Sequence, residues 1–251
     1  MNSSDKEIFV TRDNRTVYRE GDHIVKLFEN SLGKGNIFNA ALCHARVEES
    51  GLSIPEILSV DQIDGQWAIT FNYISGRTLE SIMVEDPDNI DKYLEQFVDL
   101  QLDMHSKKAP HLTLQRDKMA RKIASLEDIS STIRYELNTR LNTMPNHTKL
   151  CHGDFNPSNI IVSEDGKMTI IDWSHATQGN ASCDAAITYL QFALKDQTIA
   201  DKYLKLFCDK TGTSMQYVQN WMPIAAAAHL TMGNEDEKEF LLRWIDVIDF
   251  Q

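Results

Sequence analysis

The sequence predicts an α+β protein in which a small, sheet-rich lobe precedes a larger, mostly helical lobe. Near the N-terminus, runs of β-forming residues flank tight turn sequences, which is typical of hairpins. From Leu79 onward, most segments have the 3.6-residue periodicity of amphipathic helices. We therefore assign residues 1–72 to the first lobe and 73–251 to the second, with the connection at Asn72–Gly76.

The first lobe is expected to contain a strand, two hairpins and one helix. After the strand IFVT, the first hairpin joins TVYRE to HIVKLF through Glu20-Gly21-Asp22. The second hairpin joins PEILSV to QWAITF around Asp64-Gly65. Between them we expect one helix from Ile37 to Ser50, which Gly51 ends.

The second lobe is predicted to be helical except for one short β region. Apolar residues recur at helical spacing from Ile90 to His105. The β signal returns near Leu150–Ile171, where the runs NIIV and MTII flank the turn Glu164-Asp165-Gly166. This pattern predicts a hairpin with short strands.

Composition excludes several classes of protein. The 251 residues are 42% hydrophobic, which suffices for a compact globule, and a formal net charge of −12 argues against general nucleic-acid binding. No stretch approaches the ~20 apolar residues that span a bilayer, and MNSSDKEIFV lacks the features of a signal peptide. We therefore expect no membrane association and a cytoplasmic protein. The four cysteines are scattered, without the spacing of a zinc site or a disulfide framework.

Lys26 is the first candidate for a functional residue. In the run IVKLF, alternation places it on the same face as Ile24 and Phe28. An ammonium group on an apolar face is costly unless it meets a negative group, so an anion should lie nearby. The alternative is an edge strand from which Lys26 reaches water.

The segment HGDFNPSN, residues 152–159, has the spacing H-x-D-x-x-x-x-N of a kinase catalytic loop. Pro157 cannot continue a strand, so the chain must form a loop there. Asp154 and Asn159 can then point into one cavity while the backbone between them turns away.

The hairpin after this loop should return Asp172 close to Asn159. Carboxylate and amide oxygens are ligands that hard divalent cations prefer, so the pair is a candidate metal site. Alternatively, Asp154 and Asp172 are ordinary turn or cap residues, positions that aspartate favours.

These residues resemble the aminoglycoside phosphotransferase and choline kinase type of protein-kinase-like enzyme. The resemblance is carried by CHGDFNPSNIIV and IIDW, by IVKLF, by ITFNYISGRTL and by LDMHSKKAP. It implies a two-lobed protein-kinase-like fold: a nucleotide-covering sheet in the first lobe, and the catalytic loop, metal site and acceptor pocket in the second. It also implies transfer of the γ-phosphoryl group of ATP, with Mg²⁺, to a hydroxyl of a small molecule.

The resemblance further implies a role for individual residues. Asp154 would be the catalytic base or would position the hydroxyl, while Asn159 and Asp172 would bind Mg²⁺. Lys26 would contact the α- and β-phosphates.

Other residues would bind adenine or support the loop. The backbone carbonyl of Asn72 and the amide of Ile74 would read the adenine. Asp184 would brace the catalytic loop; an N-cap role for the following helix is an equally good interpretation and is compatible with the brace. By the same resemblance, His105 and His152 are structural.

The sequence departs from the family pattern in two places. Residues 11–16, TRDNRT, contain no glycine where kinase-like folds have a glycine-rich loop, so phosphate cover is looser or uses Asn14 and Arg15. The glutamate that normally pairs with the lysine would fall near Ala40, and the nearest carboxylates on that helix are Glu48 and Glu49.

The acceptor is less defined by the sequence. Family members act on aminoglycosides, choline and ethanolamine, homoserine, thiamine, sugars and other hydroxyl compounds. An acidic and aromatic lining of the second lobe would suit a cationic acceptor; the candidates are Glu235, Asp236, Glu237, Glu239, Trp173, Trp221, Phe240 and Trp244. The same acids also fit a helix N-terminus, with Phe240, Leu241 and Trp244 packed inward.

Three functions therefore stay open. The first is an active ATP-dependent small-molecule kinase. The second, favoured by the two departures, is a catalytically weak nucleotide-binding pseudokinase or regulatory module. The third is a metal-dependent hydrolase that uses His152, Asp154 and Asp172, although this function gives Lys26 and the adenine-binding segment no role.

Overall fold

The structure is a computed structural model that describes residues 6–12, 14–233 and 235–245. The chain forms two compact units, and each is discontinuous in sequence. The first contains the chain up to Ile82 together with Ser158–Ala176. The second contains Met83–Pro157 and the chain from Thr177 onward. The two predicted lobes are single segments, whereas in these units the segment 158–176 joins the N-terminal residues.

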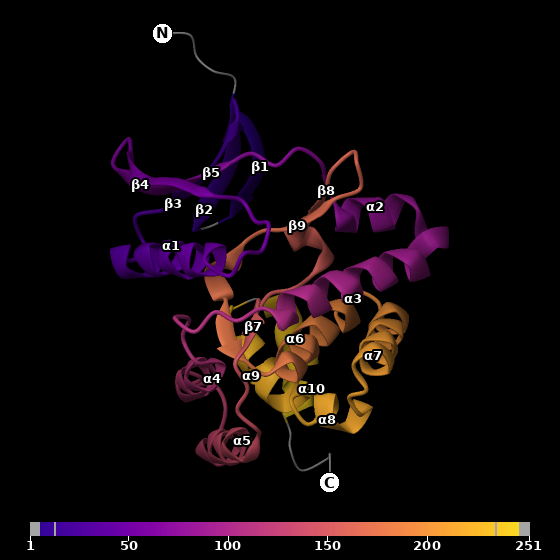
Figure 1. The fold of residues 1–251 in the computed structure, drawn as a ribbon. Coiled ribbons are helices and arrows are strands. Elements are labelled where there is room, and N and C mark those ends of the chain that lie inside the picture. The colour runs from indigo at the N-terminus through magenta and orange to yellow at the C-terminus, as the bar shows by residue number, and fades with distance from the viewer. Residues whose placement is uncertain (1–5, 13, 234, 246–251) are drawn as a thin grey trace. The chain divides into compact units, whose positions relative to one another are not determined.

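The first unit is built on a five-stranded antiparallel sheet with the order β1-β2-β3-β5-β4 (Figure 1). Both predicted hairpins are present, and β3, the second strand of the first hairpin, is the central strand of the sheet. The strands are β1 (Glu7–Arg12), β2 (Arg15–Glu20), β3 (His23–Phe28), β4 (Ile57–Ile63) and β5 (Gln66–Asn72).

One helix, α1 (Lys34–Glu48), covers one face of this sheet (Figure 1). It begins three residues before the predicted start at Ile37 and ends at Glu48, two residues before the predicted end. The apolar residues that pack the helix against the sheet are Phe28, Ile37, Ala41, Ile69 and Phe71. Lys26 shares the face of Phe28, as alternation along β3 predicts.

A smaller three-stranded sheet belongs to the same unit, with the order β6-β8-β9. Its strands are β6 (Arg77–Thr78), β8 (Ile160–Val162) and β9 (Met168–Ile170), and the 3₁₀ turn η3 (Trp173–His175) follows. The predicted hairpin is therefore present. The two-residue strand β6 was not predicted, because so short a segment shows no alternation.

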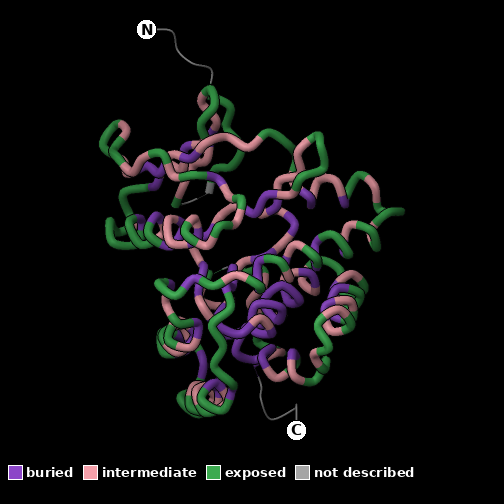
Figure 2. The backbone as a smooth tube through the Cα atoms, viewed as in Figure 1, coloured by how far each residue is buried: buried purple, intermediate pink, exposed green. Residues whose placement is uncertain are grey.

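The second unit is helical and surrounds two deeply buried helices, α6 and α9. Its helices are α3 (Ile90–Ser106), α4 (Gln115–Ala124), α5 (Ser131–Thr143), α6 (Ala181–Ala193), α7 (Gln197–Thr211), α8 (Met215–Gln219), α9 (Met222–Leu230) and α10 (Glu235–Ile245). The 3₁₀ turn η1 (Pro87–Asn89) also belongs to this unit, whereas helix α2 (Leu79–Glu85) and the 3₁₀ turn η2 (Pro157–Asn159) each contain residues of both units. Ten residues of α6 are buried, so this helix is enclosed by protein on most sides (Figure 2).

A short antiparallel pair, β7 (Lys149–Cys151) and β10 (Thr177–Gly179), also belongs to the second unit. It places the start of the predicted catalytic loop, at His152, directly after a strand. Among the described residues, none of the helices has both the length and the apolar composition that a membrane span requires.

Gly76 allows the segment before β6 to pass close to β8. Its φ is +152°, and a Cβ atom placed there would lie 2.3 Å from the backbone oxygen of Val162. We expect Gly76→Ala to lower the free energy of unfolding by roughly 2 kcal/mol or more, from backbone strain and overpacking. Chemical denaturation measures this difference.

Gly35 provides the matched control, because a Cβ at this α1 position meets open space and no positive φ opposes it. Gly35→Ala should be neutral or stabilising by a few tenths of a kcal/mol, up to about 1 kcal/mol. Equal effects of the two substitutions would contradict the proposed steric origin.

Candidate functional site

Lys26 and Asp172 form an ion pair within the first unit. The Nζ atom of Lys26 lies 2.7 Å from Oδ1 of Asp172, and the two side chains are only 16% and 13% exposed. The predicted anion beside Lys26 is therefore Asp172. The alternative of a lysine on an edge strand is wrong, because β3 is hydrogen-bonded to β2 on one side and to β5 on the other.

A second cation, Arg15, approaches the same carboxylate. Its Nη2 atom lies 3.4 Å from Oδ2 of Asp172. Burial alone would raise the pKa of Asp172, but the neighbouring charges of Lys26 and Arg15 lower it far below its usual value. Asp172 is therefore ionised at neutral pH.

Asp172 has an uncommon backbone conformation. Its φ of 62° and ψ of 61° are left-handed, a region that non-glycine residues seldom occupy. The conformation lets the chain turn from β9 into η3 at the point where the carboxylate meets Lys26. Ser174 Oγ donates a 3.0 Å hydrogen bond to Asp172 Oδ1 and holds the carboxylate in place.

Asn159 lies beside this turn, as the hairpin pattern predicts. Ile160 pairs with Ile170, and the amide of Ile171 donates a 2.9 Å hydrogen bond to the Asn159 carbonyl. Asn159 is therefore opposite the residue that precedes Asp172. An ionised carboxylate and a side-chain amide are donors that fit a hard divalent cation.

A small cavity adjoins the ion pair between the sheet and α1. Its lining includes Arg15, Lys26, Phe28, Ala40, His44, Ile69, Phe71, Asp172, Trp173 and Ser174. Ala40 therefore does lie at the predicted position near Lys26, and it offers no carboxylate. The ion pair of Lys26 within the described part of the chain is with Asp172, while Glu48 accepts a 2.8 Å hydrogen bond from the Ile57 amide.

The predicted adenine-binding segment follows β5. Asn72 ends this strand, and its side-chain Oδ1 accepts a 2.6 Å hydrogen bond from the Glu56 amide. The amide of Tyr73 donates to the carbonyl of Asp22 at 2.8 Å, which ties the segment to the β2–β3 turn. Ile74, the next residue, makes no backbone hydrogen bond to another described residue.

Asp154 belongs to the second unit, where two amide side chains orient it. Asn156 Nδ2 donates to Asp154 Oδ1 at 3.2 Å, and Gln191 Nε2 of α6 donates to the same oxygen. The neighbouring Phe155 is fully buried against Phe97, with ring centroids 4.5 Å apart. The loop is thus anchored by an aromatic side chain directly after Asp154.

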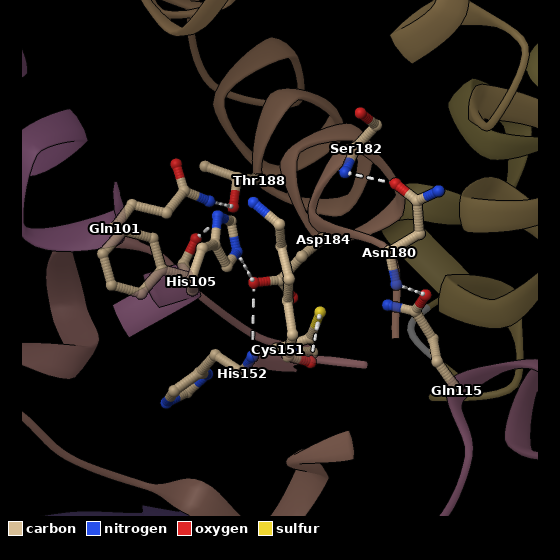
Figure 3. A network of polar contacts seen from close by, with 12 residues as sticks. Gln101, His105, Gln115, Cys151, His152, Asn180, Ser182, Asp184 and Thr188 are labelled. Carbon is tan, nitrogen blue, oxygen red and sulfur yellow. Dashed lines mark hydrogen bonds and ion pairs between the residues drawn. The ribbon is translucent and has the colours of Figure 1, made fainter. Parts of the chain in front are cut away.

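The Asp184 carboxylate accepts hydrogen bonds from the backbone of the loop (Figure 3). Its Oδ1 accepts the Gly153 amide at 2.7 Å, and its Oδ2 accepts the His152 amide at 3.2 Å and His105 Nε2 at 3.0 Å. The N-cap of α6 is Asn180, so the cap interpretation of Asp184 is wrong and the brace interpretation is confirmed.

Burial favours the neutral form of Asp184, yet the hydrogen bonds from His105 and from the Gly153 amide lower the pKa of Asp184 below 3.8.

His152 is also fully buried, and its Nδ1 accepts a 3.2 Å hydrogen bond from the Asp154 amide. This placement is structural and does not favour the hydrolase alternative. Cys151 lies in the same cluster, where burial raises the pKa of its thiol and disfavours the thiolate that binds metals.

The acidic cluster near the C-terminus is a helix N-terminus. Glu235, Asp236 and Glu237 occupy the first turn of α10, as that alternative predicted. Trp173 and Trp221 are buried in the cores of the first and second unit, respectively. The cationic nature of the acceptor thus stays a prediction.

Two residues that contact Asp154 were missed by sequence reasoning. Asn156 lies inside the motif at a position that the kinase spacing leaves undefined. Gln191 is 37 residues farther along, between Leu190 and Phe192 of a buried helix. A glutamine within such an apolar helical segment is the sequence signal that could have found it, because a polar side chain there needs a hydrogen-bond partner.

The model of the phosphotransferase enzyme family matches residues 7–216. No curated protein sequence matches the chain significantly.

Solved structures show the same fold at low sequence identity. The apo form of a thermostable mutant of aminoglycoside phosphotransferase APH(4)-Ia is 16% identical with a TM-score of 0.72, covering 98% of this chain and 94% of that one. A ternary complex of a related mutant with ADP and hygromycin B gives 15% and 0.70, with 98% and 93% covered. Choline kinase LicA from Streptococcus pneumoniae gives 16% and 0.65, with 95% and 92% covered. The predicted protein-kinase-like fold is thereby confirmed.

Replacing Asp184 tests its role as a brace. An asparagine would turn an NH₂ group toward either His105 or the loop amides, so Asp184→Asn should lower the free energy of unfolding by about 3 kcal/mol at neutral pH. Because folding lowers the pKa of Asp184, its contribution is present above the unfolded value near 3.8 and is lost as pH falls through the folded pKa. The variant should therefore lose less stability than the wild type on acidification.

Asp196 serves as the control for this substitution. It is the N-cap of α7 and accepts the amides of Thr198 and Ile199. Asparagine caps helices about as well, so Asp196→Asn should change stability by less than about 0.5 kcal/mol. Parallel acid-unfolding curves for the wild type and Asp184→Asn would contradict the assignment.

Proposed function

The chain belongs to the phosphotransferase enzyme family, and from that premise we propose that it transfers the γ-phosphoryl group of ATP to a hydroxyl of a small molecule. The observation that carries the proposal is the partly buried ion pair of Lys26 and Asp172, beside which Asn159 lies at the base of the hairpin. An ammonium group and two oxygen donors in one place are what phosphate and a divalent cation require.

Lys26 is proposed to bind the phosphates of the nucleotide. The sheet fixes its backbone from both sides, and Asp172 holds its ammonium in the small cavity. A polyphosphate would find this cation already positioned, so little conformational entropy is lost when it binds.

Asn159 and Asp172 are proposed to hold Mg²⁺. Their oxygens suit this ion, and the lowered pKa of Asp172 keeps its carboxylate charged. The ion would supply neutralisation of the phosphate charge. The residues of the chain position it: Ser174 orients Asp172, and the hairpin fixes Asn159.

Asp154 is proposed to accept the proton of the acceptor hydroxyl, or to orient that hydroxyl. Asn156 and Gln191 fix the direction of its carboxylate, while Asp184 fixes the backbone that precedes it. Positioning of this kind contributes most of catalysis in phosphoryl transfer, where the protein performs little covalent chemistry.

Adenine is proposed to bind along the backbone of Asn72 and Ile74. The Ile74 amide has no hydrogen-bond acceptor among the described residues, while the flanking Tyr73 is held by Asp22. The guanidinium of Arg19 lies 3.9 Å from the centroid of the Tyr73 ring and stiffens this segment.

The acceptor is proposed to be an aminoglycoside, an amino alcohol or a related cationic hydroxyl compound. The structural relatives include an aminoglycoside phosphotransferase bound to hygromycin B and a choline kinase. A formal net charge of −12 would attract such a cation over long range.

One observation favours a second function. Ala40 stands where a glutamate would pair with Lys26, so the described structure contains no such pair with α1. A nucleotide-binding module with little or no turnover is the corresponding alternative. Such a module would bind ATP but would not hydrolyse or transfer its phosphate with any small-molecule acceptor.

The deciding experiment is an acceptor screen that measures ADP release with ATP and Mg²⁺. The panel contains aminoglycosides, amino alcohols, sugars and nucleosides, with a no-acceptor reaction as the blank. Acceptor-dependent ADP release supports the kinase. Nucleotide binding in a thermal-shift assay, with no release above the blank for any acceptor, supports the binding module.

Replacing Asp154 tests the proposed base. Asp154→Asn should lower kcat by about 10²–10⁴-fold, because the amide cannot accept the hydroxyl proton. ADP affinity should stay within about twofold, since the proposed phosphate ligands are unchanged. Steady-state kinetics and calorimetry measure the two quantities.

Asp91 offers the matched control, because its side chain is 77% exposed in a surface pair with Lys202. Asp91→Asn should leave kcat unchanged. An active Asp154→Asn enzyme would remove Asp154 from the mechanism.

Replacing Lys26 tests the phosphate contact. Lys26→Gln should raise the KM for ATP by about tenfold or more, since a charge-assisted hydrogen bond to phosphate is lost. Lys34→Gln is the control: Lys34 is exposed at the start of α1, and the KM should not change. An unchanged KM in Lys26→Gln would separate Lys26 from nucleotide binding.

A further inference from the structure

We propose that Arg15 is a second phosphate-binding cation of the nucleotide site, in the position where other kinase-like folds use a glycine-rich loop. The inference rests on the proposed function and names a residue that would act on the same nucleotide. Four features of Arg15 support it: its position, its face of the sheet, its unused donors and the local charge.

Arg15 lies at the end of the hairpin where a phosphate loop would be. It is the first residue of β2 and pairs with Phe28 at the end of β3. Of the residues between β1 and β2, the structure describes Asn14, which lies in a turn. The Asn14 carbonyl accepts a 3.0 Å hydrogen bond from the Glu29 amide, so the turn is tied to β3.

The side chain of Arg15 is on the same face of the sheet as Lys26. Lys26 pairs with Val17, two residues after Arg15, and alternation puts Arg15 and Val17 on one face. Arg15, Lys26 and Asp172 all line the same small cavity. The two cations thus meet around one carboxylate.

Arg15 uses little of its hydrogen-bonding capacity. A guanidinium has five donors and can bind a carboxylate through two parallel hydrogen bonds. In the described part of the chain, its guanidinium donates one hydrogen bond of 3.4 Å, to Asp172, and its Nε atom is buried without a partner. A buried N–H without an acceptor is costly, and an anion with several oxygens could satisfy it.

The local charge points to the same class of ligand. Arg15 and Lys26 carry two positive charges against the single negative charge of Asp172. The remaining positive charge lies in a partly enclosed cavity, where electrostatic interactions are stronger than in water. A nucleoside diphosphate or triphosphate supplies the complementary charge and oxygens.

A purely structural Arg15, which only holds Asp172 in place, would behave differently. It would affect the stability of the fold, or every ligand of the site, in the same way. A phosphate-binding Arg15 discriminates instead between ligands with and without phosphates. Truncating the ligand therefore separates the two roles.

The experiment measures the dissociation constants of ADP and adenosine by calorimetry, with and without Mg²⁺, for the wild type, Arg15→Gln and Arg15→Lys. Arg15→Gln should weaken ADP binding by about tenfold and leave adenosine within about twofold. Arg15→Lys, which keeps the charge but loses the planar fork, should give an intermediate loss. Arg46→Gln removes a charge from α1 outside the cavity and should change neither constant.

Each outcome decides between the proposals. The role of Arg15 is overturned if the wild type binds ADP and Arg15→Gln gives any of three results. These are equal weakening of ADP and adenosine binding, unchanged ADP binding, or tighter ADP binding. A wild type that binds neither ligand overturns the proposed function itself. Thermal unfolding verifies that the variants fold, and should Arg15→Gln be unfolded, Arg15→Lys decides by the same ADP-to-adenosine comparison.

Discussion

The ion pair between Lys26 and Asp172 is the interaction on which the arrangement of the first unit depends. A partly buried ammonium on the apolar face of a central strand needs a partner, because an unpaired charge in such surroundings is costly. The partner comes from 146 positions away in the sequence, at the end of the β8–β9 hairpin. This requirement explains why the segment after Pro157 packs with the N-terminal sheet and why Asp172 tolerates a left-handed backbone.

Local patterns in the sequence were sufficient to predict most of the first unit. Alternation placed Lys26 on the same face of the strand as Ile24 and Phe28, and the turn at Glu164-Asp165-Gly166 predicted that Asn159 and Asp172 would approach each other. These predictions succeeded because each depends on a few consecutive residues. The individual chemical roles of these residues remain proposals.

Features that depend on distant contacts could not be predicted in this way. The hydrogen bond of Gln191 to Asp154 joins α6 to the loop across a long stretch of sequence, and no local period encodes it. The strands β6 and β10 are too short to show alternation. Asp184 at the start of a helix looked equally like a cap and a brace, and only the contacts of Asn180 and Gly153 distinguish the two.

The hydrogen bonds that Asp184 accepts from the loop also explain why a glycine, Gly153, stands between His152 and Asp154. Gly153 has a φ of +79°, and this rotation directs its N–H toward Asp184 in succession to that of His152. A side chain at this position would oppose the rotation, so the glycine is required by backbone stereochemistry and not by reactivity. Residues 152–154 thus serve two purposes: Asp154 supplies the proposed functional carboxylate, and the backbone conformation of Gly153 sets the direction of the chain that carries it.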